Sequence, residues 1–412
     1  MYGKEIFVLE VGFIMYNFGN VLVTEADWRT MLSVIRNLKK ILNLKINAVG
    51  RSKSGGILSR YCSNSFIVKD KEQYKQLIKN LAEQEPELVI FPHLEETYLY
   101  LYSINISNII IAPPKNLAYK ITNKLEVFSH IQHKFPEITP YSVFLSIGNQ
   151  ETFSKVQKQL EDFLLKTRKA ILKVTSEINK PYGPYNRYVV LSKDNLEKTL
   201  NSYEFKKFLL ENKDFILQEY IDGYGIGIGG VWFEGEPVCI GGHRRLLQSH
   251  GSEGISIIAE SYINNLALRY GNEIMQSLKY TGIALIEFRL RIDNKIYFME
   301  INPRVWGTLP LYIYSGLNIP SIAYQIFKYG STKNIPLSKF IEGRKMIFFK
   351  DYLLANYNKG LKEFCKAVAY SPYLLCKYKE GTFDIKDPLP FLFDTLSIAL
   401  NGLRKIWRHE WR

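Results

Sequence analysis

The stretch FMEINPRVWG, residues 298–307, is the most informative part of this sequence. Its first half has the residues of a β-strand, yet Glu300 and Asn302 lie two positions apart on it. Side chains alternate between the two faces of a strand, so this carboxylate and this amide point the same way. Pro303 then ends the strand, because it has no N–H for the ladder, directly before Arg304. The pattern predicts a strand end that presents polar groups among apolar runs.

The residues before this stretch supply a partner strand. Residues 282–304, GIALIEFRLRIDNKIYFMEINPR, hold two strand-like runs around Asp293-Asn294, which predicts a β-hairpin. If those two residues form the loop, Ile292 pairs with Lys295.

In this register two carboxylates face each other, because Glu287 lies opposite Glu300. Facing carboxylates repel and destabilise a sheet, and a cation between them would offset the repulsion. Asn302 shares their face and adds a third oxygen, and hard oxygen ligands suit Mg²⁺. The alternative is a solvated hairpin whose glutamates face water, and spacing alone leaves both open.

The composition is that of a basic globular protein. The chain has 412 residues, 46% of them hydrophobic, and this length predicts two or three packed units. A net charge of +14 favours anionic partners such as phosphates, nucleic acid or lipid headgroups. Four cysteines without a CxxC pair argue against a zinc cage or a disulfide framework, so the chain is predicted to be cytosolic.

No membrane-spanning helix is predicted, because no segment offers about 18 apolar residues without a charge. The first 19 residues hold an apolar run broken by Glu10. They are interpreted as an extension, either a non-native start or a strand that pairs elsewhere.

Residues 20 to about 115 alternate strand-like and helical patterns. Residues 30–42 carry apolar side chains at helical spacing. Strands are predicted in NVLV (20–23), LKINAVG (44–50), ELVIFPHLEE (87–96) and NIIIAPP (108–114). Such alternation predicts a parallel sheet of Rossmann-like topology. No GxGxxG follows the first strand, so nothing there favours dinucleotide binding.

The middle of the chain mixes longer strands and helices. The predictions are a helix over 123–134, a connector over 135–145, a strand over 169–176 and one amphipathic helix over 195–212. Residues 215–247 are predicted to form three strands, with a glycine-rich turn and a second turn at Glu234-Gly235.

Several polar residues in these elements suit phosphates or bases. Lys173 lies in the apolar run ILKV, where it is costly unless its ammonium reaches an anion or water; a snorkelling edge-strand lysine is the alternative. Gln218, Glu219 and Tyr220 end a strand before Gly223, where a carboxylate and free backbone groups can bind a base edge. The alternative there is a plain β-turn.

A basic stretch follows in HRRLLQSHGSEGIS, residues 243–256. Its adjacent arginines, Arg244 and Arg245, precede the glycine-bracketed Gly251–Gly254. With a flexible loop they could hold a carboxylate or a phosphate. A solvated basic face is the alternative.

The order of these elements resembles the ATP-grasp superfamily, which includes carboxylate–amine ligases related to carbamoyl phosphate synthase and biotin carboxylase. The resemblance runs from about residue 20 to 330, and MEINPR followed by Trp306-Gly307 is its most specific part. It implies a mixed α/β and α+β fold: a Rossmann-like pre-ATP-grasp domain, a two-lobed ATP-grasp fold and a basic, mainly helical extension. The implied boundaries are 1–19, 20–118, 119–330 with a lid at about 150–218, and 331–412.

The resemblance also implies roles for single residues. Nucleotide contacts would come from Lys124 and Lys173 on the phosphates and from Gln218, Glu219, Tyr220 and Ile221 around the adenine. The metal ligands would be Glu287, Glu300 and Asn302, with Mg²⁺ as the expected ion and Mn²⁺ as a substitute. Arg304 would steady the transferred phosphate, while Arg245 and the loop 251–256 would contact the substrate.

The implied activity is an ATP-dependent ligase that phosphorylates a carboxylate and joins it to an amine, releasing ADP and phosphate. Its substrates would be small molecules or peptides. The loop after Lys173, PYGPYNR, has one glycine where the family has several, and backbone approaches phosphate less easily without glycine. This departure leaves an alternative open, an ATP-binding regulatory or partner-binding protein of the same fold without turnover.

The last 82 residues, 331–412, hold 15 Lys and Arg against 8 Asp and Glu. They keep aromatic and aliphatic residues, so they are expected to fold. Their end, SIALNGLRKIWRHEWR, would suit an anionic membrane at the inner face, with Trp407 and Trp411 at the interface. The preferred alternative is a terminal helix packed on the body with a basic outer face. No nucleic-acid motif is present, and the sequence makes no prediction of oligomeric state.

Overall fold

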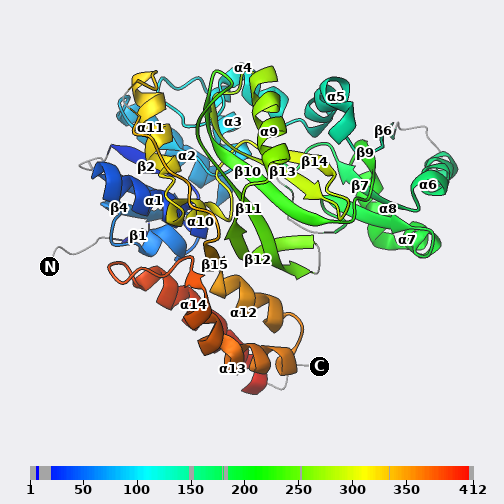
Figure 1. Ribbon diagram of the computed structural model, residues 1–412. Helices are drawn as coiled ribbons and strands as arrows, with labels where there is room; N and C mark the ends of the chain where they lie inside the picture. The colour runs from blue at the N-terminus through cyan, green and yellow to red at the C-terminus, as the bar shows by residue number, and fades with distance from the viewer. Residues whose placement is uncertain are drawn as a thin grey trace. The chain divides into compact units, whose positions relative to one another are not determined.

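The computed structural model describes residues 6–8, 20–147, 153–178, 180, 184–250, 253–333 and 335–407 (Figure 1). The chain forms two compact units. The larger unit comprises Met1–Lys115, Ile226–Ile286 and Asn302–Arg412, and the smaller unit comprises Asn116–Gly225 and Glu287–Ile301.

A parallel five-stranded sheet begins the larger unit. Across it run β1 (Ile6–Val8), β4 (Asn64–Ile67), β3 (Ile46–Gly50), β2 (Val21–Val23) and β5 (Val89–Phe91). Its helices are α1 (Arg29–Leu42), α2 (Lys71–Gln84) and α3 (Glu95–Ser103), with the 3₁₀ turn η1 (Gly55–Leu58). All three residues of β2 are buried, as expected for a parallel strand covered on both faces. The predicted Rossmann-like sheet is confirmed.

Helix α1 confirms the predicted helix over 30–42. Its buried side chains Met31, Ile35 and Leu38 recur at helical spacing, and Asn43 ends it in a left-handed conformation with φ of 50°. Part of the N-terminal extension is a pairing strand, since Ile6–Val8 lie parallel to β4.

One strand prediction in this sheet is wrong, and one strand was missed. The run 108–114 is no strand; its Ile110 makes one bridge to Ile90, and Pro113 and Pro114 lack the N–H groups that a ladder needs. Residues Asn64–Ile67 form the strand β4, although their polar start hid the apolar pattern.

An antiparallel four-stranded sheet forms the smaller unit. Its order is β6 (Ser142–Ser146), β9 (Asp214–Glu219), β7 (Lys169–Val174) and β8 (Tyr188–Ser192). The helices of this part are α4 (Lys115–Ile121), α5 (Lys124–Lys134), α6 (Phe153–Thr167), α7 (Leu196–Asn201) and α8 (Tyr203–Leu210), with the 3₁₀ turn η2 (Pro136–Ile138). The predicted strand over 169–176 and the predicted helix over 123–134 are confirmed.

Two corrections apply to the smaller unit. The predicted connector over 135–145 ends in strand β6, which pairs with β9. The predicted single helix over 195–212 is two helices, because Ser202 interrupts it. The Ser202 hydroxyl donates to the Thr199 carbonyl and accepts from the Phe205 amide at 3.2 Å, so it ends one helix and caps the next.

A seven-stranded sheet has the order β14 (Ile296–Asn302), β13 (Gly282–Leu290), β10 (Tyr224–Phe233), β11 (Glu236–His250), β12 (Glu253–Ser261), β15 (Lys345–Ile347) and β16 (Lys379–Glu380). The turn at Glu234-Gly235 is confirmed, and both residues have positive φ, at 53° and 92°. A β-carbon on Gly229 would lie 2.5 Å from the Trp306 ring, so this glycine makes room for a buried tryptophan. Trp306 therefore serves packing.

The C-terminal segment folds as part of the larger unit, as expected. It contains α12 (Phe349–Tyr357), α13 (Leu361–Lys377) and α14 (Leu389–Trp407), drawn in orange and red in Figure 1. Ahead of it lie α9 (Asn265–Ser277), α10 (Leu309–Tyr314) and α11 (Ile319–Tyr329). Among the helices that the structure describes, none combines the length and apolar character that a bilayer crossing requires.

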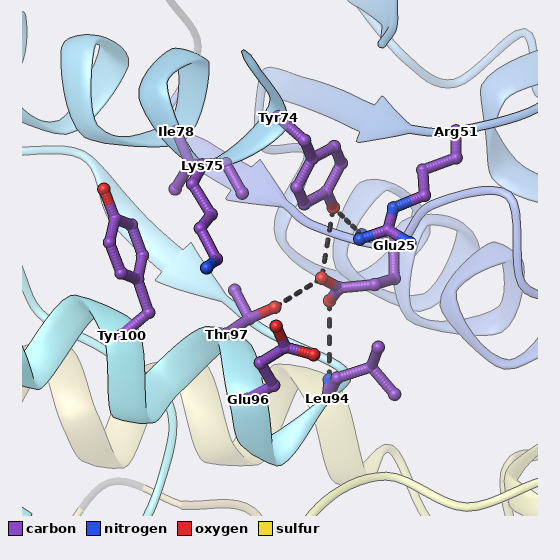
Figure 2. Close-up of a pocket in the computed structure, with 9 residues that line it drawn as sticks. All are labelled: Glu25, Arg51, Tyr74, Lys75, Ile78, Leu94, Glu96, Thr97 and Tyr100. Atoms are coloured by element: carbon purple, nitrogen blue, oxygen red, sulfur yellow. Dashed lines mark hydrogen bonds between the residues drawn. The ribbon is translucent and has the colours of Figure 1, made fainter. Parts of the chain in front are cut away.

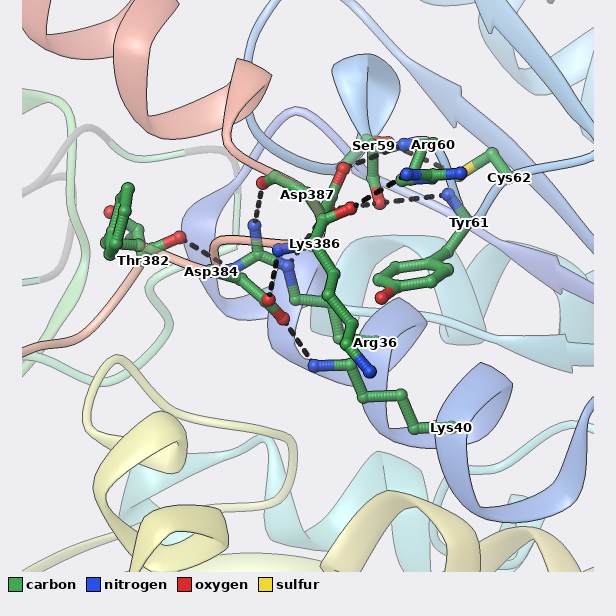
Figure 3. Close-up of polar contacts among 12 residues, drawn as sticks. Arg36, Lys40, Ser59, Arg60, Tyr61, Cys62, Thr382, Asp384, Lys386 and Asp387 are labelled. Carbon is green, nitrogen blue, oxygen red and sulfur yellow. Dashed lines mark hydrogen bonds and ion pairs between the residues drawn. The ribbon is translucent and has the colours of Figure 1, made fainter. Parts of the chain in front are cut away.

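Buried Asp387 latches this segment to the start of the chain (Figure 3). Its carboxylate accepts hydrogen bonds from Arg36 Nε at 2.9 Å, Ser59 Oγ at 2.7 Å and the Arg60 amide at 2.8 Å. The other nitrogens of Arg36 donate to the carbonyls of Thr382 and Asp387. One arginine of α1 thus holds the segment that leads into α14.

Substitution Asp387→Asn should lower the free energy of unfolding by about 3 kcal/mol, because it leaves a buried guanidinium without its counter-charge. The Arg36 and Asp387 side chains are 11% and 1% exposed. The control is Asp384→Asn, whose partner Lys40 is 44% exposed, with an expected loss below about 1 kcal/mol. Urea unfolding of the three proteins measures the difference. Equal losses in the two variants would contradict the latch.

Candidate functional site

A pocket of the smaller unit gathers several of the predicted residues. Its polar side chains are those of Lys124, Lys173, Gln218 and Glu300. Its apolar wall is formed by Ile121, Val127, Phe128, Ile216, Phe298, Met299 and Ile301. Helix α5, strands β7 and β9, and strand β14 thus bring residues from four parts of the chain together.

Lys124 is the first residue of α5. Asn123 caps this helix, since its side chain accepts a hydrogen bond from the Leu125 amide at 3.0 Å. The cap fixes the start of the helix at Lys124. Lys124 Nζ forms ion pairs with Glu300 at 2.9 Å and with Glu177. Burial by itself lowers the pKa of this ammonium, but the two carboxylates outweigh burial and raise it above its ordinary value. Lys124 is therefore a fixed positive charge.

Lys173 has the opposite electrostatic environment. Its Nζ donates to Gln218 Oε1 at 2.8 Å across the β7–β9 ladder, and Gln218 is buried. Burial, followed by repulsion from Lys124, lowers the pKa of Lys173 to about 8. An anion placed beside it would reverse this shift. The prediction that this strand lysine seeks an anion fits these surroundings, and its role stays a prediction.

Glu177 is a member of this cluster that the sequence did not reveal. It follows β7 and also accepts from Arg187 Nη1 at 2.6 Å. Arg187 in turn donates to the Lys180 carbonyl at 2.7 Å, which ties together the two ends of the glycine-poor loop. The middle of that loop, residues 181–183, lies outside the described residues.

The residues predicted around the adenine lie at the end of β9. The Glu219 amide donates to the Tyr141 carbonyl at 2.8 Å, and the Tyr220 amide donates to the Lys169 carbonyl at 3.1 Å. The Lys169 ammonium lies 3.6 Å from the centre of the Tyr220 ring, and Ile221 is buried. Two of the backbone N–H groups expected to bind a base are thus already used within the sheet.

The predicted hairpin over 282–304 is present, but its two-residue loop is wrong. The Arg291 amide donates to the Lys295 carbonyl at 2.8 Å, so Arg291 rather than Ile292 pairs with Lys295. The loop has three residues and ends in Asn294, which has φ of 63°. A single left-handed residue satisfies this loop, whereas a two-residue type I′ loop needs two.

The longer loop also changes which residues of the two strands lie opposite each other. Extended along the strands, it sets Phe288 opposite Phe298, and these rings lie 6.3 Å apart. Burial in β14 then stops alternating, because Met299 and Glu300 are both half-buried before the buried Ile301. The pairing of Glu287 with Glu300 involves residues beyond this break in β14 and stays a prediction.

Arg304 lies in the larger unit just beyond β14. Its Nε donates to Glu95 Oε1 at 2.8 Å, and its Nη2 donates to Asn302 Oδ1 at 3.4 Å. Glu95 begins α3 and is a second functional candidate that sequence reasoning missed. Burial and the charge of Arg304 hold the pKa of His93 well below its ordinary value, so this imidazole is neutral.

The basic stretch lies on β11. Arg244 forms an ion pair with Glu260 at 2.6 Å, and Arg245 Nη1 donates to the Gly254 carbonyl at 3.4 Å. His243 is buried beside Tyr312, 2.9 Å from its hydroxyl, and burial, followed by Arg245, lowers the pKa of His243 to about 3. The predicted flexible loop is mostly strand, since β12 starts at Glu253; residues 251–252 lie outside the described part.

The donor set for a metal is made of hard oxygens. Within the described part of the chain, no three His, Cys, Asp or Glu side chains come together as a metal site. The predicted ligands are two carboxylates, Glu287 and Glu300, and the amide oxygen of Asn302. Their chemistry fits Mg²⁺, which usually completes its shell with water and substrate phosphates.

A second pocket, in the larger unit, surrounds buried Glu25 (Figure 2). Glu25 follows β2, and its carboxylate accepts hydrogen bonds from Tyr74, Thr97, Thr24 and the amides of His93 and Leu94. Burial raises the pKa of this carboxyl, while these bonds oppose the rise. With so many donors already bound, Glu25 ties together the loops after β2 and β5. Arg51 and Lys75 line the rest of this pocket.

Known proteins resemble the chain in part of its sequence and in its fold. Residues 211–343 match the family described as "ATP-grasp in the biosynthetic pathway with Ter operon". No curated protein sequence matches the chain.

Three solved structures share the fold at low identity. N5-carboxyaminoimidazole ribonucleotide synthetase with ADP has a TM-score of 0.58 and 15% identity, over 82% of this chain and 84% of that one. The biotin carboxylase domain of Hydrogenobacter thermophilus 2-oxoglutarate carboxylase, with MgADP and bicarbonate, has a TM-score of 0.57 and 14% identity, over 80% and 73%. L-amino acid ligase from Bacillus licheniformis has a TM-score of 0.52 and 14% identity, over 75% and 74%.

The resemblance to the ATP-grasp superfamily is therefore confirmed: the chain has the ATP-grasp fold, and its residues 211–343 match an ATP-grasp family.

Proposed function

We propose that the protein is an ATP-dependent carboxylate–amine ligase. The supporting observation is the pocket of the smaller unit, where Lys124, Lys173 and Glu300 meet on an ATP-grasp fold. These side chains suit phosphates and a divalent cation, and they occur in the order that the family resemblance implied. The similar folds of a synthetase with ADP and of an amino acid ligase support the same reaction class.

The two lysines would bind the ATP phosphates. In the structure, carboxylate oxygens of Glu177 and Glu300 occupy the donors of Lys124, and phosphate oxygens would replace at least one of them. Lys173 would gain a counter-charge in exchange for its neutral amide partner, Gln218. The adenine would lie at the end of β9, where the Glu219 carboxylate accepts a hydrogen bond from its amino group and the backbone near Tyr220 and Ile221 contacts the ring.

Glu287, Glu300 and Asn302 would hold Mg²⁺, and Mn²⁺ has a similar preference for oxygen ligands. The ion, when bound, offsets the negative charge that develops on the phosphate oxygens. Glu300 would become available to the metal ion once Lys124 bound a phosphate of ATP instead. Asn302 already orients Arg304, whose guanidinium would steady the transferred phosphoryl group.

The proposed reaction has two steps. A substrate carboxylate oxygen attacks the γ-phosphorus, the bond to the β-phosphate oxygen breaks, and ADP leaves. The nitrogen of an amine then attacks the acyl carbon, phosphate leaves with the bonding electrons, and the nitrogen loses a proton. No protein nucleophile is required, so the residues serve to position groups and to stabilise charge. Arg245 is the candidate for binding the substrate carboxylate.

The substrates would be a small-molecule or peptide carboxylate and an amine, and the expected compartment is the cytoplasm. Among the described residues, Cys62, Cys239, Cys365 and Cys376 are not joined in disulfides, which suits a reducing compartment.

Substitution Glu300→Gln should lower ATP turnover by at least about 100-fold, because it removes a charged metal ligand from the site of phosphoryl transfer. The control is Glu197→Gln, on an exposed position of α7 in the same unit, and its turnover should equal that of the unaltered protein. The assay follows ADP and phosphate release while carboxylate and amine pairs are screened. Release of AMP and pyrophosphate would contradict the mechanism. ATP binding without turnover on any pair would favour the binding-only alternative.

ATP binding near pH 8.5 should take up as much as about one proton per site. Free Lys173, with a pKa of about 8, is mostly neutral there, and bound phosphates would raise that pKa and protonate it. Below about pH 7 the uptake should vanish, since the lysine is already charged. Calorimetry in buffers of different ionisation enthalpy measures the uptake, with Lys173→Met as the comparison. The same uptake in this variant would refute the assignment.

A further inference from the structure

Helix α14 buries a mixed face and leaves a row of leucines exposed. Phe391 and Ile398 pack on a hydrophobic core beside the polar contacts of this face. On the inward face, buried Asp394 accepts from Ser54 Oγ at 2.6 Å and from Lys350 Nζ at 3.0 Å. On the outward face five apolar side chains follow one another at helical spacing. They are Leu389, Leu392, Phe393, Leu396 and Leu400, which are 54%, 45%, 39%, 57% and 53% exposed. This set is called the leucine face.

The leucine face lies mostly ahead of the stretch for which the sequence predicted a basic outer face. That prediction concerned residues 397–412, whose basic side chains lie outside the described part of the chain, so it stays a prediction. Between residues 389 and 400 the outer face is apolar, and these residues include no lysine or arginine. A contiguous exposed apolar stripe of this kind marks a contact surface.

In the same C-terminal segment several acidic side chains are buried, while many lysines are exposed. Glu380, Asp387 and Asp394 are buried. The exposed lysines on α13 and the turns around it are Lys359, Lys362, Lys366, Lys377, Lys379 and Lys386, of which Lys366 pairs with the partly exposed Glu363. Asp387 and Asp394 bind side chains outside the segment, while the lysines give its surface a positive potential.

We propose that the leucine face docks on an anionic lipid surface, with α14 lying in the plane of the interface. An apolar helix face on a basic body is the combination by which peripheral helices bind acidic membranes. Exposed Tyr370 and Tyr373 on α13 are of the residue type enriched at membrane interfaces. The inference does not depend on the proposed ligase activity.

Charge argues against the leading competitor, a second copy of the chain. Two copies joined through this segment would bring together two segments, residues 331–412 of each copy, with a formal net charge of +7 each. Such like charges repel at short range and favour a partner of opposite sign. An acidic bilayer supplies that sign together with an apolar layer for the leucines.

The test is sedimentation of the full chain with vesicles. Vesicles of phosphatidylcholine and phosphatidylglycerol in equal parts should carry the protein down, and vesicles of phosphatidylcholine alone should bind it far less. Binding should weaken as salt is raised, because the lysine contribution is screened. Substitution Leu396→Ser should weaken binding about tenfold, since one buried leucine is lost from the contact. Lys377→Glu should weaken it by a similar factor.

The matched controls lie in the smaller unit, on α8. Leu210→Ser and Lys206→Glu change an exposed leucine and an exposed lysine there, and vesicle binding should stay unchanged. Circular dichroism checks that each variant is folded. Failure to bind acidic vesicles would overturn the proposal. So would equal weakening by the controls, or a dimer in size-exclusion chromatography that Leu396→Ser dissociates. ATP turnover should be unaffected by Leu396→Ser, which separates this inference from the ligase function.

Discussion

An ammonium between two carboxylates holds the candidate nucleotide site together. Lys124 begins α5, Glu300 lies near the end of β14, and Glu177 follows β7, so one cation joins three elements. Burial opposes the charge of the lysine, and the carboxylates restore it. A phosphate on Lys124 would release Glu300 for a metal ion. The same charged side chains would therefore have different partners in the two states: Lys124 pairs with Glu177 and Glu300 in the structure, and it would pair with phosphate in the proposed nucleotide complex.

Local sequence patterns predicted the helices and strands that carry this site. They could not predict which charged side chains pair within it. The apolar spacing of α1, the strand around Lys173 and the hairpin around Glu300 are all short-range signals. Glu177 and Glu300 lie 53 and 176 positions from Lys124. No periodicity links such residues, because only the tertiary fold brings them together. Only the order of motifs, through the family resemblance, pointed to Lys124 and Glu300 as parts of one site.

The hairpin over residues 282–304 shows how the length of one loop limits predictions of strand pairing. A loop of two or three residues changes the pairing by one position, and one position changes which side chains share a face. Asn294 adopts the left-handed conformation alone, which selects the longer loop. Strand β14 then breaks its alternation at Met299 and Glu300. A sequence pattern can predict that a carboxylate ends a strand, but the loop and the irregularity determine what it faces.

Helix α14 shows the same limit for orientation. A periodic pattern identifies an apolar face, and the usual inference places that face inward. Here the inward side is fixed by Asp394 with Ser54 and Lys350, together with the latch of Asp387 on Arg36. Breaking the pair of Arg36 with Asp387 would leave a mostly buried charge without its partner, which costs more than the exposure of a single leucine. Apolar packing acts on the same side, because Phe391 and Ile398 of α14 lie against the hydrophobic core. Polar and apolar contacts together therefore set the orientation of this helix. The leucines are left outside, where they gain burial only when another surface covers them.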